Sequence, residues 1–168
     1  RKGETGMLQA EWKGKKALVE AVVFDMDGLM YDSERVVMRS WDEAGAQMGY
    51  GKLGDNIYYT LGMGAGERKA YFMAKYGAAF PYQTFQTLYR EAFYRISDTE
   101  GIPLKPGLRE LLCFLREKAI PVAMATSTGG SDVKRRMERD ALESFFQVIV
   151  TGDMVKKTKP SPEIYEKA

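Results

Sequence analysis

The second half of the chain alternates short apolar runs with amphipathic segments, and this order limits the possible folds more than any other feature. Leucines at helical spacing begin at residue 108, and an apolar run follows at residues 120–126. A helical pattern over residues 131–143 then leads to a second apolar run at residues 147–151. Such alternation is typical of right-handed β-α-β units with a parallel sheet. The sequence therefore predicts an α/β fold.

An earlier apolar run, residues 18–24, has the composition of a buried parallel strand. A long stretch with helical periodicity separates it from the later strands, and its clearest helix is expected between Phe85 and Ile96. We expect this stretch to be an inserted helical subdomain. Residues 1–17 are polar and are expected to form a loosely attached leader.

The composition excludes several kinds of chemistry. The chain has no His and a single Cys, Cys113, which excludes His-based triads, His metal ligands, an internal disulfide and a Cys-based zinc site. The 25 basic and 23 acidic residues argue against a nucleic-acid partner, and the basic run at residues 134–136 and Asp153 are expected to be solvated. No segment has the length of a membrane span or the pattern of a signal peptide. We therefore expect a cytoplasmic protein without a membrane partner.

Two carboxylates follow the first apolar run directly, in Asp25-Met26-Asp27-Gly28. The side-chain period of a strand is two, so both carboxylates can project from the same side of the strand end. Ligands of open α/β sheets bind at this edge. Acids held close together have pKa values that move apart, which suits one nucleophile and one acid–base group. A hard cation such as Mg²⁺ would ease the repulsion between them.

Three hydroxyl residues, Thr126, Ser127 and Thr128, end the second apolar run just before two glycines and a helix. Hydroxyls and free main-chain N–H groups at such a junction can bind an anion. Lys159 follows the third apolar run by a short loop and could reach the same edge of the sheet.

Three segments together resemble motifs of the haloacid dehalogenase-like superfamily of phosphoryl-transfer enzymes: FDMDGLMYDSE (24–34), MATST (124–128) and KPSPEIY (159–165). The resemblance implies a Rossmann-like parallel-sheet core over residues 1–33 and 106–168. It also implies that residues 34–105 form an α-helical cap inserted after the first motif.

Carried over residue by residue, the resemblance implies a role for each candidate. Asp25 would be the nucleophile that forms an aspartyl-phosphate, and Asp27 the acid that protonates the leaving oxygen and then activates water. Both would bind Mg²⁺, Asp27 through its main-chain carbonyl. Thr126 and Ser127 would bind the phosphate, and Lys159 would screen charge between nucleophile and phosphate. The implied activity is a magnesium-dependent phosphatase acting on a small phosphorylated metabolite.

Two departures bear on the activity. The match is nearest to the β-phosphoglucomutase-like branch, whose mutases carry a His in the first cap helix where this chain has Val37. The loop at residues 61–66 also lacks the Arg that grips a second phosphate. A phosphatase is therefore favoured over a sugar-phosphate mutase, and a catalytically dead phosphate-binding module remains an alternative. Substrate choice is expected to lie in the cap, at residues 62–66 and near residues 36–40.

The family's fourth motif, a pair of acids that completes the magnesium site, should follow Lys159 by a couple of dozen residues. The sequence ends at Ala168, so the core is expected to be C-terminally incomplete, as a fragment or as a natural relative. We expect this form to hold little magnesium. Residues 18–24 would then be a sheet edge, covered by self-association, by residues 1–17 or by a further segment.

Overall fold

The computed structural model describes residues 8–168 and divides into two compact units. The first, here called the sheet unit, comprises residues 1–31 and 104–168. The second, the helical unit, comprises residues 32–103, where the sequence suggested 34–105. No helix within the described part of the chain is long and apolar enough to cross a membrane.

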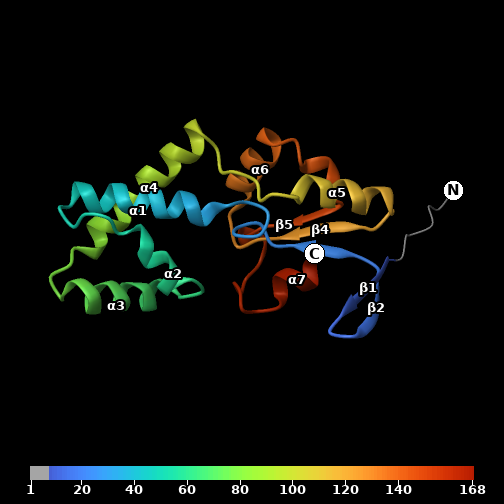
Figure 1. Ribbon diagram of the computed structural model, residues 1–168, viewed down its shortest axis with the longest axis horizontal. Helices are drawn as coiled ribbons and strands as arrows, with labels where there is room; N and C mark the ends of the chain where they lie inside the picture. Colours follow the sequence, from blue (N-terminus) through green and yellow to red (C-terminus); the bar gives the residue numbers. More distant parts are fainter. Residues whose placement is uncertain (1–7) are drawn as a thin grey trace. The chain divides into compact units, whose positions relative to one another are not determined.

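The sheet unit contains three parallel strands in the order β3-β4-β5. The strands and their helices are β3 (Val22–Phe24), α5 (Leu108–Glu117), β4 (Val122–Ala125), α6 (Gly130–Arg139), β5 (Val148–Val150) and α7 (Glu163–Lys167), with short 3₁₀ turns at Glu143–Phe145 and Gly152–Met154. Val22 lies opposite Val122, and Ala123 lies opposite Val148. Figure 1 shows α5 and α6 on one side of this sheet and α7 on the other. The predicted α/β fold is confirmed.

The core of the sheet unit explains why these short strands form. Every residue of β4 is buried, because β4 is the central strand and has neighbours on both sides. Leu112 and Leu115 of α5 are buried as well. On α7, Ile164 packs in one apolar cluster with Val150. A continuous apolar run such as β4 is what a strand covered on both faces requires.

The N-terminal segment differs from the prediction. β1 (Leu8–Trp12) and β2 (Lys15–Val19) form an antiparallel hairpin that is a sheet of its own. Lys13 and Gly14 turn between them with φ of 50° and 73°, the backbone that tight hairpin turns require. The predicted leader is therefore wrong for residues 8–17, and residues 1–7 lie outside the described part. The predicted strand over residues 18–24 is also too long, since its first residues belong to β2.

Strand β3 lies at the edge of its sheet. Among residues 8–168 it pairs with β4 and with no other strand, and Val23 is 40% exposed. The hairpin does not join this edge, so covering by residues 8–17 through strand pairing is wrong. Self-association and covering by a further segment stay predictions.

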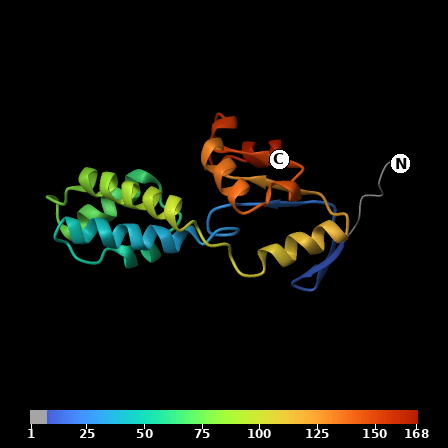
Figure 2. The same cartoon turned by 90° about the horizontal axis from the view of Figure 1, so that it is seen from above.

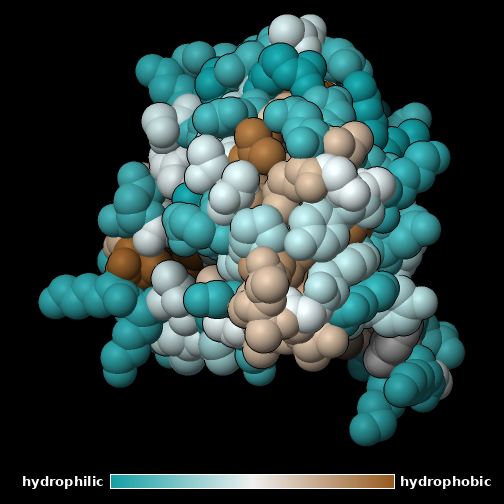
Figure 3. All heavy atoms as spheres, turned by 90° about the vertical axis from the view of Figure 1, so that its left-hand side faces the viewer, coloured by the Kyte–Doolittle hydropathy of each residue, from teal (hydrophilic) through white to brown (hydrophobic). Residues whose placement is uncertain are grey.

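The helical unit is built around a cluster of aromatic side chains. Its elements are α1 (Ser33–Gln47), a 3₁₀ turn (Gly54–Asn56), α2 (Ile57–Thr60), α3 (Ala65–Tyr76) and α4 (Tyr82–Thr99). Trp41, Phe72 and Phe85 lie at its centre, and the ring centroids of Trp41 and Phe72 are 5.3 Å apart. Figure 2 shows α1 and α4 running side by side. On the face that Figure 3 shows, hydrophilic spheres lie mainly at the periphery and surround a central area of intermediate and apolar spheres.

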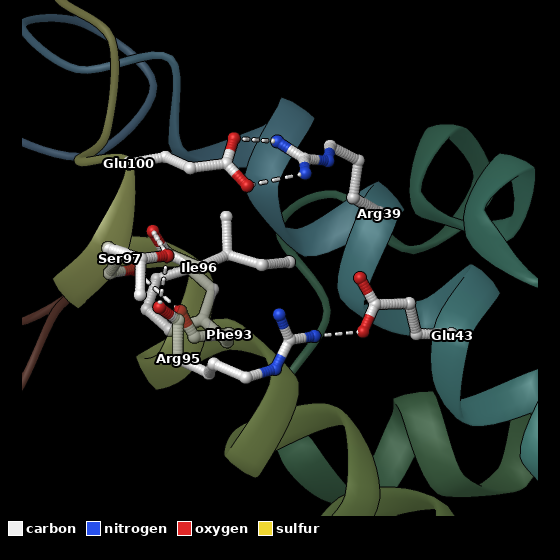
Figure 4. A network of polar contacts seen from close by, with 8 residues as sticks. Arg39, Glu43, Phe93, Arg95, Ile96, Ser97 and Glu100 are labelled. Carbon is white, nitrogen blue, oxygen red and sulfur yellow. Dashed lines mark hydrogen bonds and ion pairs between the residues drawn. The ribbon is translucent and has the colours of Figure 1, made fainter.

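Polar contacts join α1 and α4 at their surface. The Arg39 guanidinium donates to both carboxylate oxygens of Glu100, at 2.7 and 2.9 Å, and Arg95 pairs with Glu43 (Figure 4). The side chain of Ile96 points toward α1 between these two pairs and is fully buried. The hydrogen bond from Arg39 lowers the pKa of the Glu100 carboxyl. These exposed pairs orient the two helices, whereas the buried side chains supply most of the packing energy.

Two helix ends differ from the sequence expectation. Helix α3 begins at Ala65, so part of the expected loop at residues 61–66 is helical, and Glu67 accepts a hydrogen bond from the Gly64 N–H ahead of it. Helix α6 ends at Arg139, because Ala141 takes a positive φ of 50°. An expected helix over residues 131–143 is therefore shorter in the structure.

Candidate active site

Asp25 follows the last residue of β3 and is held at one oxygen only. Its Oδ1 accepts a hydrogen bond from the Met26 N–H at 2.8 Å and lies 3.0 Å from Nζ of Lys159. Its Oδ2 has no protein partner within residues 8–168. The side chain is 42% exposed. A fixed carboxylate with one unengaged oxygen is suited to attack on, or coordination of, a ligand.

Asp27 lies two residues further along, and both of its carboxylate oxygens have a partner. Its Oδ1 is 2.9 Å from Nη1 of Arg136, and its Oδ2 accepts a hydrogen bond of 2.6 Å from the Thr128 hydroxyl. Gly28 makes the turn that follows, with a φ of 77° and its N–H donating to the Tyr31 carbonyl. The two carboxylates therefore have different hydrogen-bond and ion-pair partners.

Arg136 is a site residue that the sequence reasoning placed wrongly. Its side chain is only 11% exposed and pairs with Asp27, whereas a solvated helix face was expected. The sequence carries only a weak signal for this position, the spacing of Arg136 from an apolar residue of the same helix. Val133 and Met137 are the buried residues of α6, and Arg136 lies three residues after the first and one before the second. The spacing of three places Arg136 on the same side of the helix as Val133.

The hydroxyl residues after β4 divide into buried and exposed positions. Thr126 is 1% exposed, and its Oγ1 accepts from the Thr128 N–H at 3.1 Å. Ser127 is exposed. Gly152 passes so close that a Cβ there would lie 2.2 Å from the Ser127 carbonyl oxygen, so only Gly fits that position. This loop leaves the Ser127 hydroxyl accessible to a ligand.

Asp153 is exposed, as the sequence predicted, but its carboxylate also accepts hydrogen bonds from the chain. Its Oδ1 accepts a hydrogen bond of 3.1 Å from the N–H of Gly130, the first residue of α6, and a second from the Thr151 hydroxyl. The bond from Thr151 is the main cause that lowers the pKa of the Asp153 carboxyl. This carboxylate occupies part of the α6 N-terminus, where an anion would otherwise be favoured.

Lys159 connects the loop after β5 to the ends of the other two strands. Its Nζ donates to the Ala125 carbonyl at 3.1 Å, pairs with Asp25, and lies 4.9 Å from the ring centroid of Tyr165. Partial burial by itself lowers the pKa of Lys159, but the hydrogen bonds with Tyr165 and Asp25 outweigh it and raise that pKa. The ammonium is therefore charged at neutral pH.

The structure joins four of the five predicted residues in two pairs, one by direct contact and the other through one intervening residue. Lys159 contacts Asp25, and Thr128 links Thr126 to Asp27. Ser127 is the fifth, next in the chain to Thr126. Two carboxylates thus face two cationic groups at the carboxyl ends of β3 and β4.

The oxygen donors fit a magnesium ion held by few protein ligands. Within residues 8–168, no three acidic or Cys side chains form a cluster that could hold a metal ion. Asp25 offers Oδ2, and the hydrogen bonds around the turn run from Gly28 to Tyr31 and from Tyr31 to Met26, so they do not use the Asp27 carbonyl. Magnesium commonly binds one or two protein ligands together with water and phosphate oxygens.

Comparison with known proteins gives consistent matches. The sequence profile of the haloacid dehalogenase-like hydrolases matches residues 19–168. A phosphorylated carbohydrates phosphatase of Thermotoga maritima is 35% identical over 149 residues, which covers 88% of this chain and 68% of that protein. Protein CbbY of Cereibacter sphaeroides is 30% identical over 160 residues, which covers 90% of this chain and 70% of that protein.

Solved structures show the same likeness. The crystal structure of a proposed β-phosphoglucomutase from Thermotoga maritima matches with a TM-score of 0.67 at 33% identity, over 88% of this chain and 68% of that one. CbbY from Rhodobacter sphaeroides in complex with phosphate matches with a TM-score of 0.61 at 29% identity, over 88% of this chain and 70% of that one.

Proposed function

Because the chain belongs to the haloacid dehalogenase-like hydrolases, we propose that it is a phosphatase acting on a small phosphorylated carbohydrate. The observation that carries this proposal is the Asp25 carboxylate, with one unengaged oxygen and the Lys159 ammonium 3.0 Å from the other. Relatives named as a phosphorylated carbohydrates phosphatase and a hexitol phosphatase support the substrate class, and a relative named as a phosphoglycolate phosphatase supports the reaction.

In the proposed first step, an oxygen of Asp25 attacks phosphorus and the ester P–O bond breaks. The bond's electron pair leaves with the alkoxide oxygen, which takes a proton from Asp27. Lys159 places a positive charge beside an anionic nucleophile that approaches an anionic phosphoryl group. Phosphoryl transfer depends mainly on such positioning and charge neutralisation. The Ser127 hydroxyl is exposed where it can donate to a phosphoryl oxygen.

In the proposed second step, Asp27 removes a proton from water, whose oxygen attacks the phosphorus of the aspartyl-phosphate. The P–O bond to Asp25 breaks, its electron pair returns to the Asp25 carboxylate, and inorganic phosphate leaves. The hydrogen bonds to Asp27 suit this step. Arg136 and Thr128 both donate to it, and these two contacts fix the orientation of the carboxylate. For the first step, Asp27 must carry a proton and give up one of these two contacts.

Magnesium dependence is part of the proposal. The Asp25 carboxylate and the Asp27 carbonyl would hold the ion, with water and phosphoryl oxygens in its other positions. When bound, it would neutralise charge on the transferring phosphoryl group. Because two protein ligands are few, we propose that the ion binds weakly before substrate arrives.

The test is release of inorganic phosphate from a panel of carbohydrate phosphates, with an aryl phosphate as a generic substrate. We expect turnover in millimolar magnesium and its loss after addition of EDTA. A mutase would instead convert a sugar 1-phosphate to its 6-phosphate when a sugar bisphosphate is supplied. A shift of the melting temperature by phosphate without turnover of any substrate would indicate a phosphate-binding module and contradict the phosphatase.

Thr128 gives a prediction specific to the Asp27 contact. Thr128→Val removes the hydroxyl that donates to Asp27 but keeps the side-chain shape. A hydrogen bond to a charged group is worth about 1.5–3 kcal/mol, so kcat for the aryl phosphate should fall by about 10- to 150-fold. Thr128→Ser retains a hydroxyl and should stay near the wild-type kcat. Equal losses in the two variants would show that the hydrogen bond to Asp27 is not the cause.

A further inference from the structure

The carboxylate of Glu163, the first residue of α7, binds the main chain of the loop that precedes this helix. Its Oε1 accepts a hydrogen bond of 2.9 Å from the Lys156 N–H, and its Oε2 accepts one of 2.9 Å from the Lys157 N–H. Hydrogen bonds to a charged acceptor are stronger than those between neutral groups. These two bonds lower the pKa of the Glu163 carboxyl, so it is ionised at neutral pH. One side chain therefore fixes two successive residues of the loop.

Helix α7 holds the loop at a second point and is itself fixed to the sheet. Nζ of Lys167 donates to the Met154 carbonyl and lies 4.0 Å from Oε1 of Glu163. Ile164, the residue after Glu163, is 1% exposed and packs in one apolar cluster with Val150 of β5. The loop is thus attached to a helix that cannot easily shift against the strands.

The residues that Glu163 binds lead directly to Lys159. Only Thr158 separates Lys157 from Lys159, and its carbonyl accepts a hydrogen bond of 3.1 Å from the Ser161 N–H. The main chain is therefore held on both sides of Lys159. A lysine side chain is a flexible stem with a point charge at its end, so the place of its ammonium depends on where its main chain is fixed.

We propose that Glu163 is a positioning residue: by binding two main-chain N–H groups of the loop, its carboxylate keeps the Lys159 ammonium beside Asp25. Its hydrogen bonds go to the loop and not to the reacting atoms, so it acts through Lys159. The expected effect on rate rests on the proposed function. Misplacing a catalytic group by about 1 Å can cost on the order of a hundredfold in rate, so a loop contact remote from the chemistry can matter.

The first test measures the environment of Lys159 and needs no turnover. A limiting amount of an amine-reactive acetylating reagent is added to the full chain, and modification of each lysine is followed by peptide mass spectrometry. Lys159 should react slowly in the unaltered protein, because its Nζ is hydrogen-bonded and its side chain is only 24% exposed. The amide of Glu163→Gln has one acceptor oxygen for two N–H donors. This variant should speed modification of Lys159 severalfold relative to Lys134, a 70% exposed lysine of α6.

Glu166→Gln is the matched control. It makes the same chemical change on the same helix, at an exposed residue three positions further along. It should leave both the modification of Lys159 and kcat/KM unchanged. Thermal unfolding shows whether Glu163→Gln folds, and Glu163→Asp replaces it if it does not. The shorter side chain keeps the charge but cannot hold both N–H groups unless the loop moves, so we expect a smaller change in the same direction.

The second test asks whether Glu163 acts through Lys159. Glu163→Gln should lower kcat/KM for an aryl phosphate by about tenfold, less than complete removal of the ammonium, because the loop keeps one of its two bonds. In a protein that already carries Lys159→Gln, the added Glu163→Gln change should alter kcat/KM by less than about twofold. A residue that only supports the fold would have the same effect in both backgrounds.

Two results would overturn the proposal. One is unchanged modification of Lys159 in folded Glu163→Gln protein, and the other is an equal loss of kcat/KM with and without Lys159→Gln. Failure of the proposed function looks different. In that case the unaltered protein hydrolyses no ester, while Glu163→Gln still speeds the modification of Lys159 and Glu166→Gln does not.

Discussion

Asp25→Asn is expected to abolish phosphate release from an aryl phosphate while the protein stays folded. The amide is a far weaker nucleophile than the carboxylate, and the proposed aspartyl-phosphate forms on this side chain. The fold should survive because the side chain is 42% exposed and its ion pair with Lys159 is partly solvated. Such pairs contribute about 0–1 kcal/mol to stability. The measurements are the initial rate of phosphate release and the thermal unfolding curve.

A matched control keeps this result specific. Asp55→Asn makes the same chemical change at an exposed position of the helical unit and should leave the rate unchanged. Slow deamidation of the introduced Asn would regenerate Asp25, so Asp25→Ala is a second variant that cannot revert in this way and should be equally inactive.

The aspartyl-phosphate can also be detected directly. Covalent label should remain on the wild-type protein after acid quench of a reaction with ³²P-labelled substrate. A wild-type rate in the folded Asp25→Asn protein would refute its role as nucleophile.

The positions of Asp25 and Thr126 were predictable because they depend on local sequence. An apolar β-branched run must end where polar residues begin, and the carboxyl ends of parallel strands meet at one edge of the sheet. Once β3 and β4 pair in parallel, the residues after Phe24 and Ala125 are neighbours at that edge. Lys159 follows by the same reasoning, one strand further along.

Other features depend on contacts that local sequence does not reveal. The Arg136 contact to Asp27 requires the orientation of α6 about its axis, and the basic residues around it suggested solvent. The hairpin before β3 depends on a turn at Lys13 and Gly14 within a segment whose polar composition resembles a tail.

Lys159→Gln is expected to lower kcat/KM by on the order of a hundredfold, the scale found when one preorganised electrostatic group is removed from an active site. The reason is that the ammonium lies 3.0 Å from Asp25 and would oppose the charge that accumulates as nucleophile and phosphoryl group meet. Lys159→Arg retains a cation and should recover part of the activity. Lys157→Gln, an exposed position in the same loop, is the matched control and should behave as wild type.

The pH dependence tests the charge of Lys159 directly. Its pKa is raised in the folded chain, since the hydrogen bonds with Tyr165 and Asp25 outweigh burial, so the ammonium persists to higher pH than a free lysine. The stability that this shift contributes is fully present below the ordinary lysine pKa and is lost as the pH rises through the raised value. The wild-type rate should therefore show no loss attributable to this lysine between neutral pH and its ordinary pKa of about 10.4. The contradicting result is a fall of the wild-type rate with rising pH inside that interval that disappears in Lys159→Arg. It would show that Lys159 loses its proton at a lower pH and is therefore not a permanent cation beside the nucleophile.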